Sequence, residues 1–333
     1  MKFAVIGAGS IGKRHIGNLL EKGIAPGDIA VVDPREDRRA EIGQKFEIGT
    51  VGAEVALLDG LDLDGAFICS PTSMHIDQAA PLAERGINLL IEKPLDASLA
   101  GVDRLQRAVD AGKSQLVIAY CFRFSQHARK LRELVQDEVV GKPLYVHGEF
   151  SEYLPDWHPW EDYRTFYMAK KAGGGGSLLD QSHIIDIAHW VLGDIESVFA
   201  FNGNLSDLEV ETDDYAEMMM RFRSGVTGVI HQDMFGRKHA KFLEIKCVEG
   251  NIYWDVYDCS VTVYDARSRT TVVHHTPKDH QIMYRNERDH FLDLCAGRAD
   301  RSESSLAEGI HGMKIIAAAQ RSSASGRLET VEG

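Results

Sequence analysis

Apolar residues form short runs along the first third of the chain, separated by segments with helical spacing. The runs lie at residues 2–6, 29–32, 66–69, 88–91 and 116–119. Short apolar runs that alternate with helical segments are typical of parallel strands joined by crossover helices. We therefore predict a doubly wound α/β domain over residues 1–121.

The pattern changes after residue 121. After a helix expected near 128–136, apolar and polar positions alternate, and strands are predicted at 144–150, 215–222, 226–230, 242–247, 251–255, 261–264 and 271–275. Closely spaced strands of this kind indicate an antiparallel sheet. With helices predicted near 288–295 and 304–319, we expect a second domain of the α+β class over residues 122–333.

The first apolar run leads directly into a glycine turn with the spacing GxGxxG, at Gly7, Gly9 and Gly12. Ser10 and Ile11 start the helical segment that follows, and the free N–H groups and dipole of such a helix start favour a pyrophosphate. Asp33 ends the second run, about 20 residues after the turn, where an acid that binds the adenosine ribose is expected. These residues predict a dinucleotide site.

Asp33 also affects the choice of cofactor. Its carboxylate would repel the 2′-phosphate of NADP, which favours NAD. Arg35, Arg38 and Arg39 follow closely, and a guanidinium near the ribose could accommodate that phosphate. The three arginines could equally form the solvent-facing side of the next helix. We expect NAD, with NADP as the second option.

Two more polar stretches follow the third and fourth apolar runs. They contain Ser70, Pro71, Thr72 and His75 after the third run, and Glu92, Lys93 and Pro94 after the fourth. Ligands of open α/β sheets bind at the carboxyl ends of the strands, so both stretches are predicted to contact the cofactor. Pro94 restricts the backbone of Lys93 and allows a cis bond, so Lys93 is expected to be held in place by a rigid neighbour.

Four glycines at residues 173–176 precede three titratable groups. Glycines allow positive φ and a close approach of the backbone to a neighbour. Asp180, His183 and Asp186 lie three residues apart, so each is expected to be the surface neighbour of the next on one helix. This stretch is a candidate reaction centre.

Residues 153–167, shortly before the glycine run, are rich in aromatic side chains. Aromatic faces stack on sugar rings, and an arginine can hold a phosphate or carboxylate. Trp160 and Arg164 are therefore candidate substrate contacts, although the same segment could form only a packed loop. Tyr120 and Arg123, after the last strand of the first domain, are two further candidates.

The composition and net charge of the chain limit the classes of molecule that it is expected to bind. The chain has 333 residues and a formal net charge of −13, which disfavours nucleic acid or an anionic membrane as the main partner. No window approaches 18 uninterrupted apolar residues, and the start of the chain runs straight into a strand, so a cytoplasmic location is expected. The five cysteines are scattered without a CxxC pair, which indicates reduced thiols rather than disulfides or a zinc site.

These motifs together resemble the glucose-fructose oxidoreductase/inositol dehydrogenase (Gfo/Idh/MocA) family. The resemblance rests on the glycine turn with Lys13-Arg14-His15 after it, the Ser70-Pro71-Thr72 turn, Glu92-Lys93-Pro94, and the glycine run leading to Asp180 and His183. It implies an N-terminal Rossmann domain and a C-terminal domain whose large, mostly antiparallel open sheet forms a homodimer or homotetramer. It also implies hydride transfer between a nicotinamide and a secondary alcohol or ketone carbon of a sugar, nucleotide-sugar or cyclitol.

The resemblance further implies residue roles. Lys93 would polarise the reacting oxygen, His183 would be the general acid/base, and Asp180 would orient the substrate or Lys93. Histidine's reference pKa of about 6.5 suits proton exchange near neutrality. Family members commonly place this Asp and His four residues apart, whereas here they are three apart, and both spacings keep a pair on one helix face. We expect no metal here, since no further ligand cluster accompanies these residues and His189.

Two alternative functions share this architecture. An NAD-dependent glycosidase would oxidise a sugar carbon transiently, eliminate the aglycone and reduce the carbon again, without net NADH. A dinucleotide-sensing regulator would bind the cofactor without catalysis, but the presence of Lys93 and His183 in matching positions argues against it.

Overall fold

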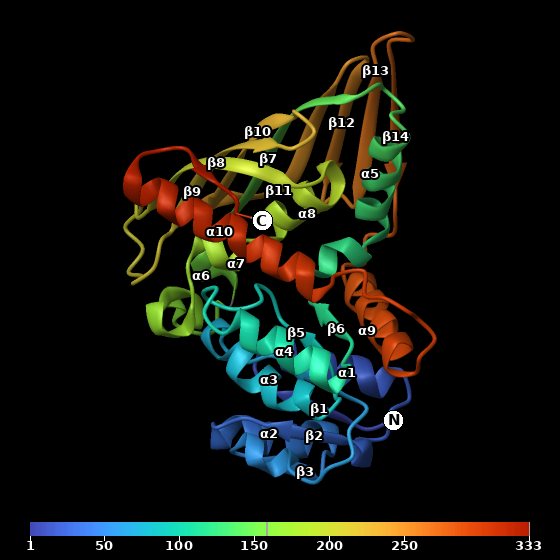
Figure 1. The fold of residues 1–333 in the computed structure, drawn as a ribbon, viewed down its shortest axis with the longest axis vertical. Coiled ribbons are helices and arrows are strands. Elements are labelled where there is room, and N and C mark those ends of the chain that lie inside the picture. Colours follow the sequence, from blue (N-terminus) through green and yellow to red (C-terminus); the bar gives the residue numbers. More distant parts are fainter. Residues whose placement is uncertain (158, 333) are drawn as a thin grey trace. The chain divides into compact units, whose positions relative to one another are not determined.

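The chain folds into two compact units in the computed structural model, which describes residues 1–157 and 159–332 (Figure 1). Unit 1 comprises residues 1–121 and 281–310, and unit 2 comprises the other described residues. From the sequence, residues 281–310 were expected in the C-terminal domain. They fold with unit 1 because Phe291 packs edge-on against Phe67 of the first sheet, with ring centroids 5.0 Å apart.

Unit 1 contains a six-stranded parallel sheet with the strand order β3-β2-β1-β4-β5-β6. Its strands are β1 (Phe3–Ile6), β2 (Ile29–Val32), β3 (Thr50–Gly52), β4 (Gly65–Ile68), β5 (Asn88–Ile91) and β6 (Leu116–Ile118). Its α-helices are α1 (Ser10–Glu21), α2 (Glu36–Phe46), α3 (His75–Glu84), α4 (Val102–Gly112) and α9 (Gln281–Cys295). The five predicted strands are confirmed, and their burial explains why they are apolar throughout.

Unit 2 contains a nine-stranded sheet with the order β14-β13-β12-β11-β7-β10-β9-β8-β15. Its strands are β7 (Pro143–Tyr153), β8 (Ile195–Gly203), β9 (Tyr215–Phe222), β10 (Thr227–Asp233), β11 (Phe235–Cys247), β12 (Gly250–Asp255), β13 (Ser260–Asp265), β14 (Thr270–His275) and β15 (Glu329–Thr330). Neighbouring strands are antiparallel except for β7 and β10, which are parallel. The predicted α+β class with a large, mostly antiparallel sheet is confirmed.

Helices cover one face of this larger sheet (Figure 1). They are α5 (Gln126–Gln136), α6 (Leu154–Trp157), α7 (Ser177–Asp180), α8 (His183–Leu192) and α10 (Leu306–Ser325), of which α10 begins in unit 1. Short 3-10 helices lie at Pro26–Asp28, Val55–Leu58, Thr72–Met74, Cys121–Phe124, Tyr163–Thr165, Tyr167–Ala169 and Lys171–Gly173. Along β9 the side chains alternate, with Met218 and Met220 buried under the helices and Met219 58% exposed on the other face.

None of the helices in the described part of the chain has the length and apolarity that a membrane crossing requires.

Candidate functional site

The glycine turn in unit 1 is shaped by close contacts of the backbone with itself. Gly7 has φ +97°, and a Cβ atom there would lie 2.4 Å from the carbonyl oxygen of Cys69. A Cβ atom on Gly12 would lie 1.9 Å from the carbonyl oxygen of Gly7. Both positions therefore require glycine, because a side chain would separate α1 from the ends of β1 and β4.

Gly9 differs from the other two glycines of the turn. The nearest atom to a Cβ on Gly9 would be Nη1 of Arg38, at 3.7 Å, so this side of the turn is open. Ser10 and Ile11 begin α1, and its first turn carries no acidic side chain. Free N–H groups at an uncrowded helix start favour a phosphate. The turn thus fits the pyrophosphate of a dinucleotide.

Asp33 lies at the end of β2 and is 2% exposed. Its carboxylate accepts hydrogen bonds from the backbone N–H groups of Ala8, at 2.7 Å, and Arg35, at 2.9 Å. Arg38 Nη1 lies 3.5 Å from the same carboxylate, whereas Arg39 donates to the carbonyl oxygen of Asp33. The predicted ribose acid is therefore tied to the glycine turn, and Arg38 is the arginine whose guanidinium contacts this carboxylate.

His75 joins the loops after β4 and β5. The ring is 1% exposed, with Nδ1 3.1 Å from the carbonyl oxygen of Pro94 and Nε2 3.0 Å from that of Ser70. Burial lowers the pKa of His75, and a neutral imidazole can donate to only one of these oxygens. The Lys93–Pro94 peptide bond is cis. Unit 1 thus brings the Ser70 and Lys93 stretches together.

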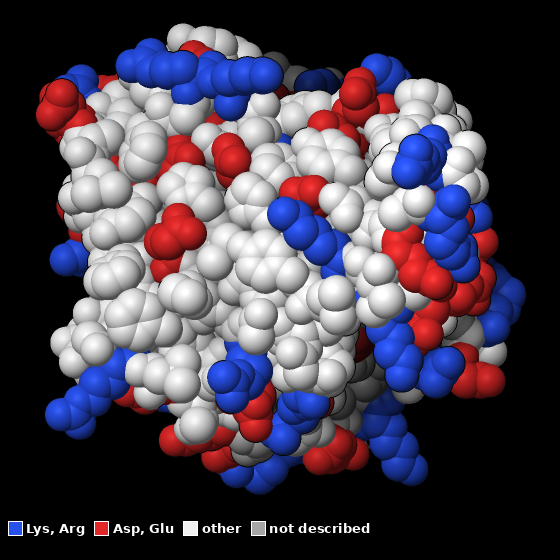
Figure 2. Space-filling model, turned by 90° about the horizontal axis from the view of Figure 1, so that it is seen from above, with Lys and Arg blue, Asp and Glu red and all other residues white. Residues whose placement is uncertain are grey.

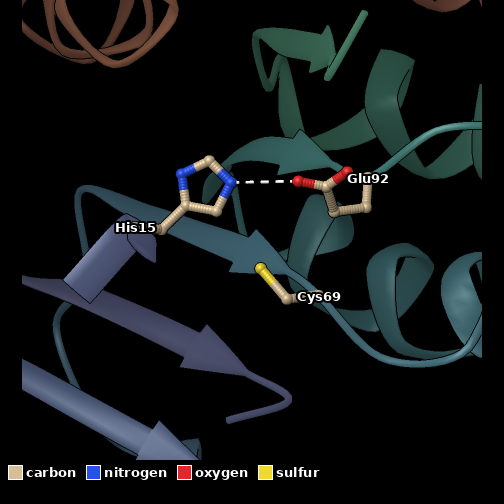
Figure 3. A group of neighbouring side chains, drawn as sticks. All are labelled: His15, Cys69 and Glu92. Atoms are coloured by element: carbon tan, nitrogen blue, oxygen red, sulfur yellow. Dashed lines mark hydrogen bonds and ion pairs between the residues drawn. The ribbon is translucent and has the colours of Figure 1, made fainter. Parts of the chain in front are cut away.

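A buried histidine lies against Glu92, the half-buried acid directly before Lys93 (Figure 3). His15, on α1, is 0% exposed, and its Nε2 lies 3.0 Å from Oε1 of Glu92. Figure 3 shows Cys69 beside this pair, and burial holds the pKa of the Cys69 thiol well above its usual value. The pair connects the backbone of Lys93 to α1. His15 was quoted only as part of the family resemblance, and its place one turn after Gly12 is the signal that could have marked it.

Glu287 on α9 is a second acid that the sequence did not reveal. It is 0% exposed, and its oxygens have no hydrogen-bond partner among residues 1–157 and 159–332. Burial, followed by the charge of Glu92, holds the pKa of Glu287 well above its usual value. It was missed because α9 is remote in sequence from the rest of unit 1.

The glycine run of unit 2 is packed against the protein itself. A Cβ atom on Gly175 would lie 2.2 Å from the carbonyl oxygen of Met168, and one on Gly176 would lie 2.3 Å from Oδ1 of Asp213. Gly176 also has φ +113°. Asp213 Oδ2 accepts the N–H of Leu178 at 2.8 Å in the first turn of α7. The close approach that these two glycines permit is thus made by the chain's own segments.

Asp180, His183 and Asp186 do not lie on one continuous helix, contrary to the expectation from their spacing. Asp180 ends α7 and His183 begins α8, with Gln181 and Ser182 between the two helices. All three titratable side chains are nonetheless buried, with exposed fractions of 8%, 9% and 5% respectively. The interruption means that helical spacing alone does not determine how Asp180 is oriented.

Two aromatic residues contact this group. Tyr167, in the aromatic segment, donates its hydroxyl to Oδ1 of Asp180 at 2.7 Å. Phe122 stacks on the ring of His183, with centroids 4.5 Å apart and planes inclined by 28°. Neither was singled out from the sequence, because Tyr167 is one of several aromatic residues in its segment and Phe122 belongs to an ordinary apolar stretch remote from the glycine run.

Arg123 forms a buried ion pair with Asp186. Its Nε and Nη2 atoms lie 2.9 and 2.7 Å from the two carboxylate oxygens, and its side chain is 0% exposed. This bidentate pair fixes α8 to the segment that enters unit 2. Tyr120, the neighbouring candidate, is 1% exposed in unit 1.

The two substrate candidates of the aromatic segment lie at the surface. The Trp160 side chain is 76% exposed. Arg164 pairs with Asp162, at 2.8 Å, and with Glu209, at 3.2 Å. These bonds hold the pKa of Arg164 above its usual value. Arg164 is thus engaged by two carboxylates, and most of the Trp160 side chain is exposed to solvent.

Comparison with known proteins covers both parts of the chain. Residues 1–120 match the oxidoreductase family with an NAD-binding Rossmann fold, and residues 128–253 match the GFO/IDH/MocA C-terminal domain. Myo-inositol 2-dehydrogenase of Thermotoga maritima is 31% identical over 238 residues, which cover 69% of this chain and 67% of that protein. The 2,7-anhydro-N-acetylneuraminate hydratase of Mediterraneibacter gnavus is 23% identical, with coverages of 85% and 78%.

The fold also matches a solved structure over its full length. Levoglucosan dehydrogenase in complex with NADH and levoglucosan aligns with a TM-score of 0.86 and 20% identity, covering 100% of both chains. The chain therefore belongs to the Gfo/Idh/MocA family of NAD-binding oxidoreductases.

Proposed function

We propose that the protein transfers a hydride between NAD and a secondary alcohol or ketone carbon of a sugar, nucleotide-sugar or cyclitol. The observation that carries the proposal is the buried group of Asp180 and His183 in unit 2, in a chain whose unit 1 holds a dinucleotide turn and Lys93. A relative that is named for myo-inositol supports a polyhydroxylated substrate. A cytoplasmic enzyme with no nucleic-acid or membrane partner is part of the proposal, and the acidic net charge supports it.

Each proposed catalytic residue has a separate task. NAD, when bound, supplies the hydride acceptor. Lys93 donates a hydrogen bond to the reacting oxygen, and His183 accepts the proton that leaves this oxygen. Asp180 orients the reacting groups, and its carboxylate is in turn held by Tyr167. Phe122 covers one face of the His183 ring and limits its rotation.

Other residues act through the backbone or through another side chain. We assign a positioning role to His75, because its ring lies between the carbonyl oxygens of Ser70 and Pro94. The bond from His15 to Glu92 positions the start of the Lys93 stretch in the same way.

Direct contact with the cofactor is proposed for the glycine turn and for the polar residues that end three strands. The proposed contacts are Gly7, Gly9, Ser10, Ile11, Gly12, Asp33, Ser70, Pro71, Thr72 and Glu92. Among the substrate candidates, the exposed indole of Trp160 is available to stack on a sugar ring. Arg164 would have to leave Asp162 and Glu209 to bind an anionic group.

The proposal is tested by a screen of sugars, cyclitols and nucleotide-sugars, with NAD and NADP in parallel, read as absorbance of the reduced nicotinamide. Lys93→Met and His183→Gln should each lower kcat with an active substrate by at least about a hundredfold while NADH binding is retained. Lys45→Met and His275→Gln replace exposed residues and serve as matched controls. Wild-type turnover in either site variant would refute the assigned roles.

The same screen separates the alternatives. Cleavage of a glycoside without net NADH would indicate transient oxidation and elimination. Tight NADH binding without turnover of any compound would indicate a sensing role instead.

We also propose that two copies associate through the open face of the larger sheet. This face carries Phe201, Met219, Tyr253, Tyr264 and Val273, each at least 36% exposed. Strand register places outward residues of β8, β9, β10 and β7 in a continuous surface. Figure 2 shows a broad surface with few charged groups, and most Lys and Arg side chains lie towards its edges. Extended exposed apolar patches commonly mark protein–protein interfaces.

Met219→Asp places a charge on this face and should shift the molar mass measured by light scattering from that of a dimer or tetramer to that of a monomer. Leu205→Asp is the matched control, because Leu205 is also exposed in unit 2 but precedes β9 in a loop. A monomeric wild-type protein would refute this part of the proposal.

A further inference from the structure

Two histidines and an aspartate converge in unit 2, apart from the proposed reaction centre. His189 lies in the last turn of α8, Asp194 lies just after this helix, and His311 lies on α10. One ligand atom of each residue lies within 4.8 Å of the other two. We propose that these three side chains bind a divalent transition-metal ion of the zinc class.

The spacing of the first two ligands already suits a tetrahedral ion. His189 Nε2 lies 3.2 Å from Asp194 Oδ1. For metal–ligand bonds of about 2.0–2.1 Å, neighbouring ligand atoms of a tetrahedron are about 3.3 Å apart. The ring of His311 has its centroid 4.5 Å from that of His189, with planes inclined by 33°. The two imidazole rings thus already lie side by side.

The backbone holds the pair from α8 in place. Gly193 has φ +89° and donates its N–H to the carbonyl oxygen of His189 at 2.8 Å, which ends the helix and turns Asp194 back towards the histidine. His311 comes from a separate helix. The site would thus connect the carboxyl end of α8 to α10, whereas His183 stands at the opposite end of α8.

The donor set selects the class of ion. Two imidazoles and one carboxylate suit Zn²⁺, Co²⁺ or Ni²⁺, whereas Mg²⁺ and Ca²⁺ prefer oxygen ligands throughout. His311 Nε2 is buried and has no hydrogen-bond partner within the described ranges 1–157 and 159–332. The Asp194 side chain is 56% exposed, which leaves room for entry of the ion and for a water molecule as fourth ligand.

One neighbouring cation opposes binding. Arg223 Nε lies 3.9 Å from Asp194 Oδ2, and the Arg223 backbone N–H donates to the Asp194 carbonyl oxygen at 2.8 Å. The guanidinium competes with the ion for the carboxylate, so its removal should tighten binding. Lys314, one turn after His311 on α10, adds a second positive charge.

The test uses the full chain without a histidine tag, stripped with a chelator and titrated with Co²⁺, followed by displacement with Zn²⁺. We expect one equivalent of Co²⁺ with the absorption spectrum of a tetrahedral site. His311→Gln and Asp194→Asn should each weaken the binding by at least about tenfold, and Arg223→Ala should strengthen it. His275→Gln, on β14, is the control for binding by exposed histidines.

Asp194→Asn keeps the proposal testable if a histidine variant folds poorly, because the Asp194 side chain is largely exposed. Zn²⁺ should raise the Tm of the wild-type protein by more than it raises that of this variant, and the two should have similar Tm values in chelator. The absence of a one-equivalent site in the wild-type protein would overturn the proposal. The proposal would also be overturned if His311→Gln and Asp194→Asn both bound the metal ion with wild-type affinity.

Discussion

The Tyr167 hydroxyl donates a 2.7 Å hydrogen bond to Oδ1 of Asp180. This bond connects the aromatic segment before the glycine run to the proposed reaction centre. It limits the rotation of the carboxylate that is expected to orient the reacting groups, at a position where α7 ends and the helix is interrupted.

Tyr167→Phe removes the hydroxyl that makes this bond and keeps the aromatic ring. We expect kcat to fall by about tenfold, because Asp180 loses a fixed orientation but keeps its charge. The dissociation constant of NADH should be unchanged. Tyr163→Phe, in the same segment, is the control, since the Tyr163 hydroxyl accepts the N–H of Glu209 instead. Equal kcat values in the two variants would show that the Tyr167 hydroxyl does not contribute to catalysis by orienting Asp180.

Asp33→Asn removes a negative charge but retains an oxygen for the N–H of Ala8. We expect NADH to bind about tenfold more weakly, because a hydrogen bond to a charged acceptor is replaced by one to a neutral acceptor. The affinity for NADPH should rise relative to the affinity for NADH, since repulsion of the 2′-phosphate is removed and Arg38 is released from the carboxylate. Fluorescence titration with both cofactors measures this. Asp37→Asn, an exposed neighbour, should leave the ratio of affinities unchanged.

Arg123→Lys replaces the planar group that binds both oxygens of Asp186. A lysine cannot reproduce two parallel hydrogen bonds, and both partners are almost fully buried. We expect the free energy of unfolding in urea to fall by about 3 kcal/mol. Arg164→Lys disrupts an exposed arginine–carboxylate pair and should cost less than about 1 kcal/mol. Similar losses in the two variants would contradict this explanation.

His127 makes stability sensitive to acid. The ring is 4% exposed, accepts a hydrogen bond from Trp254 Nε1 at 2.6 Å, and has its pKa lowered to about 4 by burial. The unfolded chain binds a proton near pH 6.5 that the folded protein does not bind until about pH 4. The folded protein should therefore lose stability as the pH falls through this window, by about 2 kcal/mol at pH 5.

His127→Gln should remove this share of the pH dependence in urea unfolding measured at pH 7 and pH 5. His275→Gln, an exposed histidine, should retain the wild-type difference between the two pH values. A wild-type pH dependence in His127→Gln would show that burial of this ring is not the cause.

Five of the six strand positions in unit 1 could be predicted because these five strands are largely buried on both faces and so appear as apolar runs. β3 was not predicted, since it has only three residues and Thr50 is exposed. β8 in unit 2 was not predicted for a different reason. Its inward residues Val198 and Ala200 alternate with Phe199 and Phe201 on the open face, so the centre of the strand lacks the alternation of apolar and polar residues of an ordinary half-buried strand.

The sequence by itself determined the two-part architecture and the glycine turn of the dinucleotide site. It could do so because a buried strand and a GxGxxG turn are local patterns, in which neighbouring residues satisfy the geometric requirement themselves. Asp33 could be identified for a similar reason, since its distance from the turn follows from the length of one strand–helix–strand unit.

Only the tertiary structure decided how Asp180 and His183 are held. The interruption between α7 and α8 depends on Gln181, which is 0% exposed and donates its side-chain N–H to the carbonyl oxygen of Asp233 at 2.6 Å. The orientation of Asp180 likewise depends on Tyr167. These contacts join residues that lie 52 and 13 positions apart in the chain, and helical periodicity carries no information about which partner outside the helix will satisfy a buried polar group.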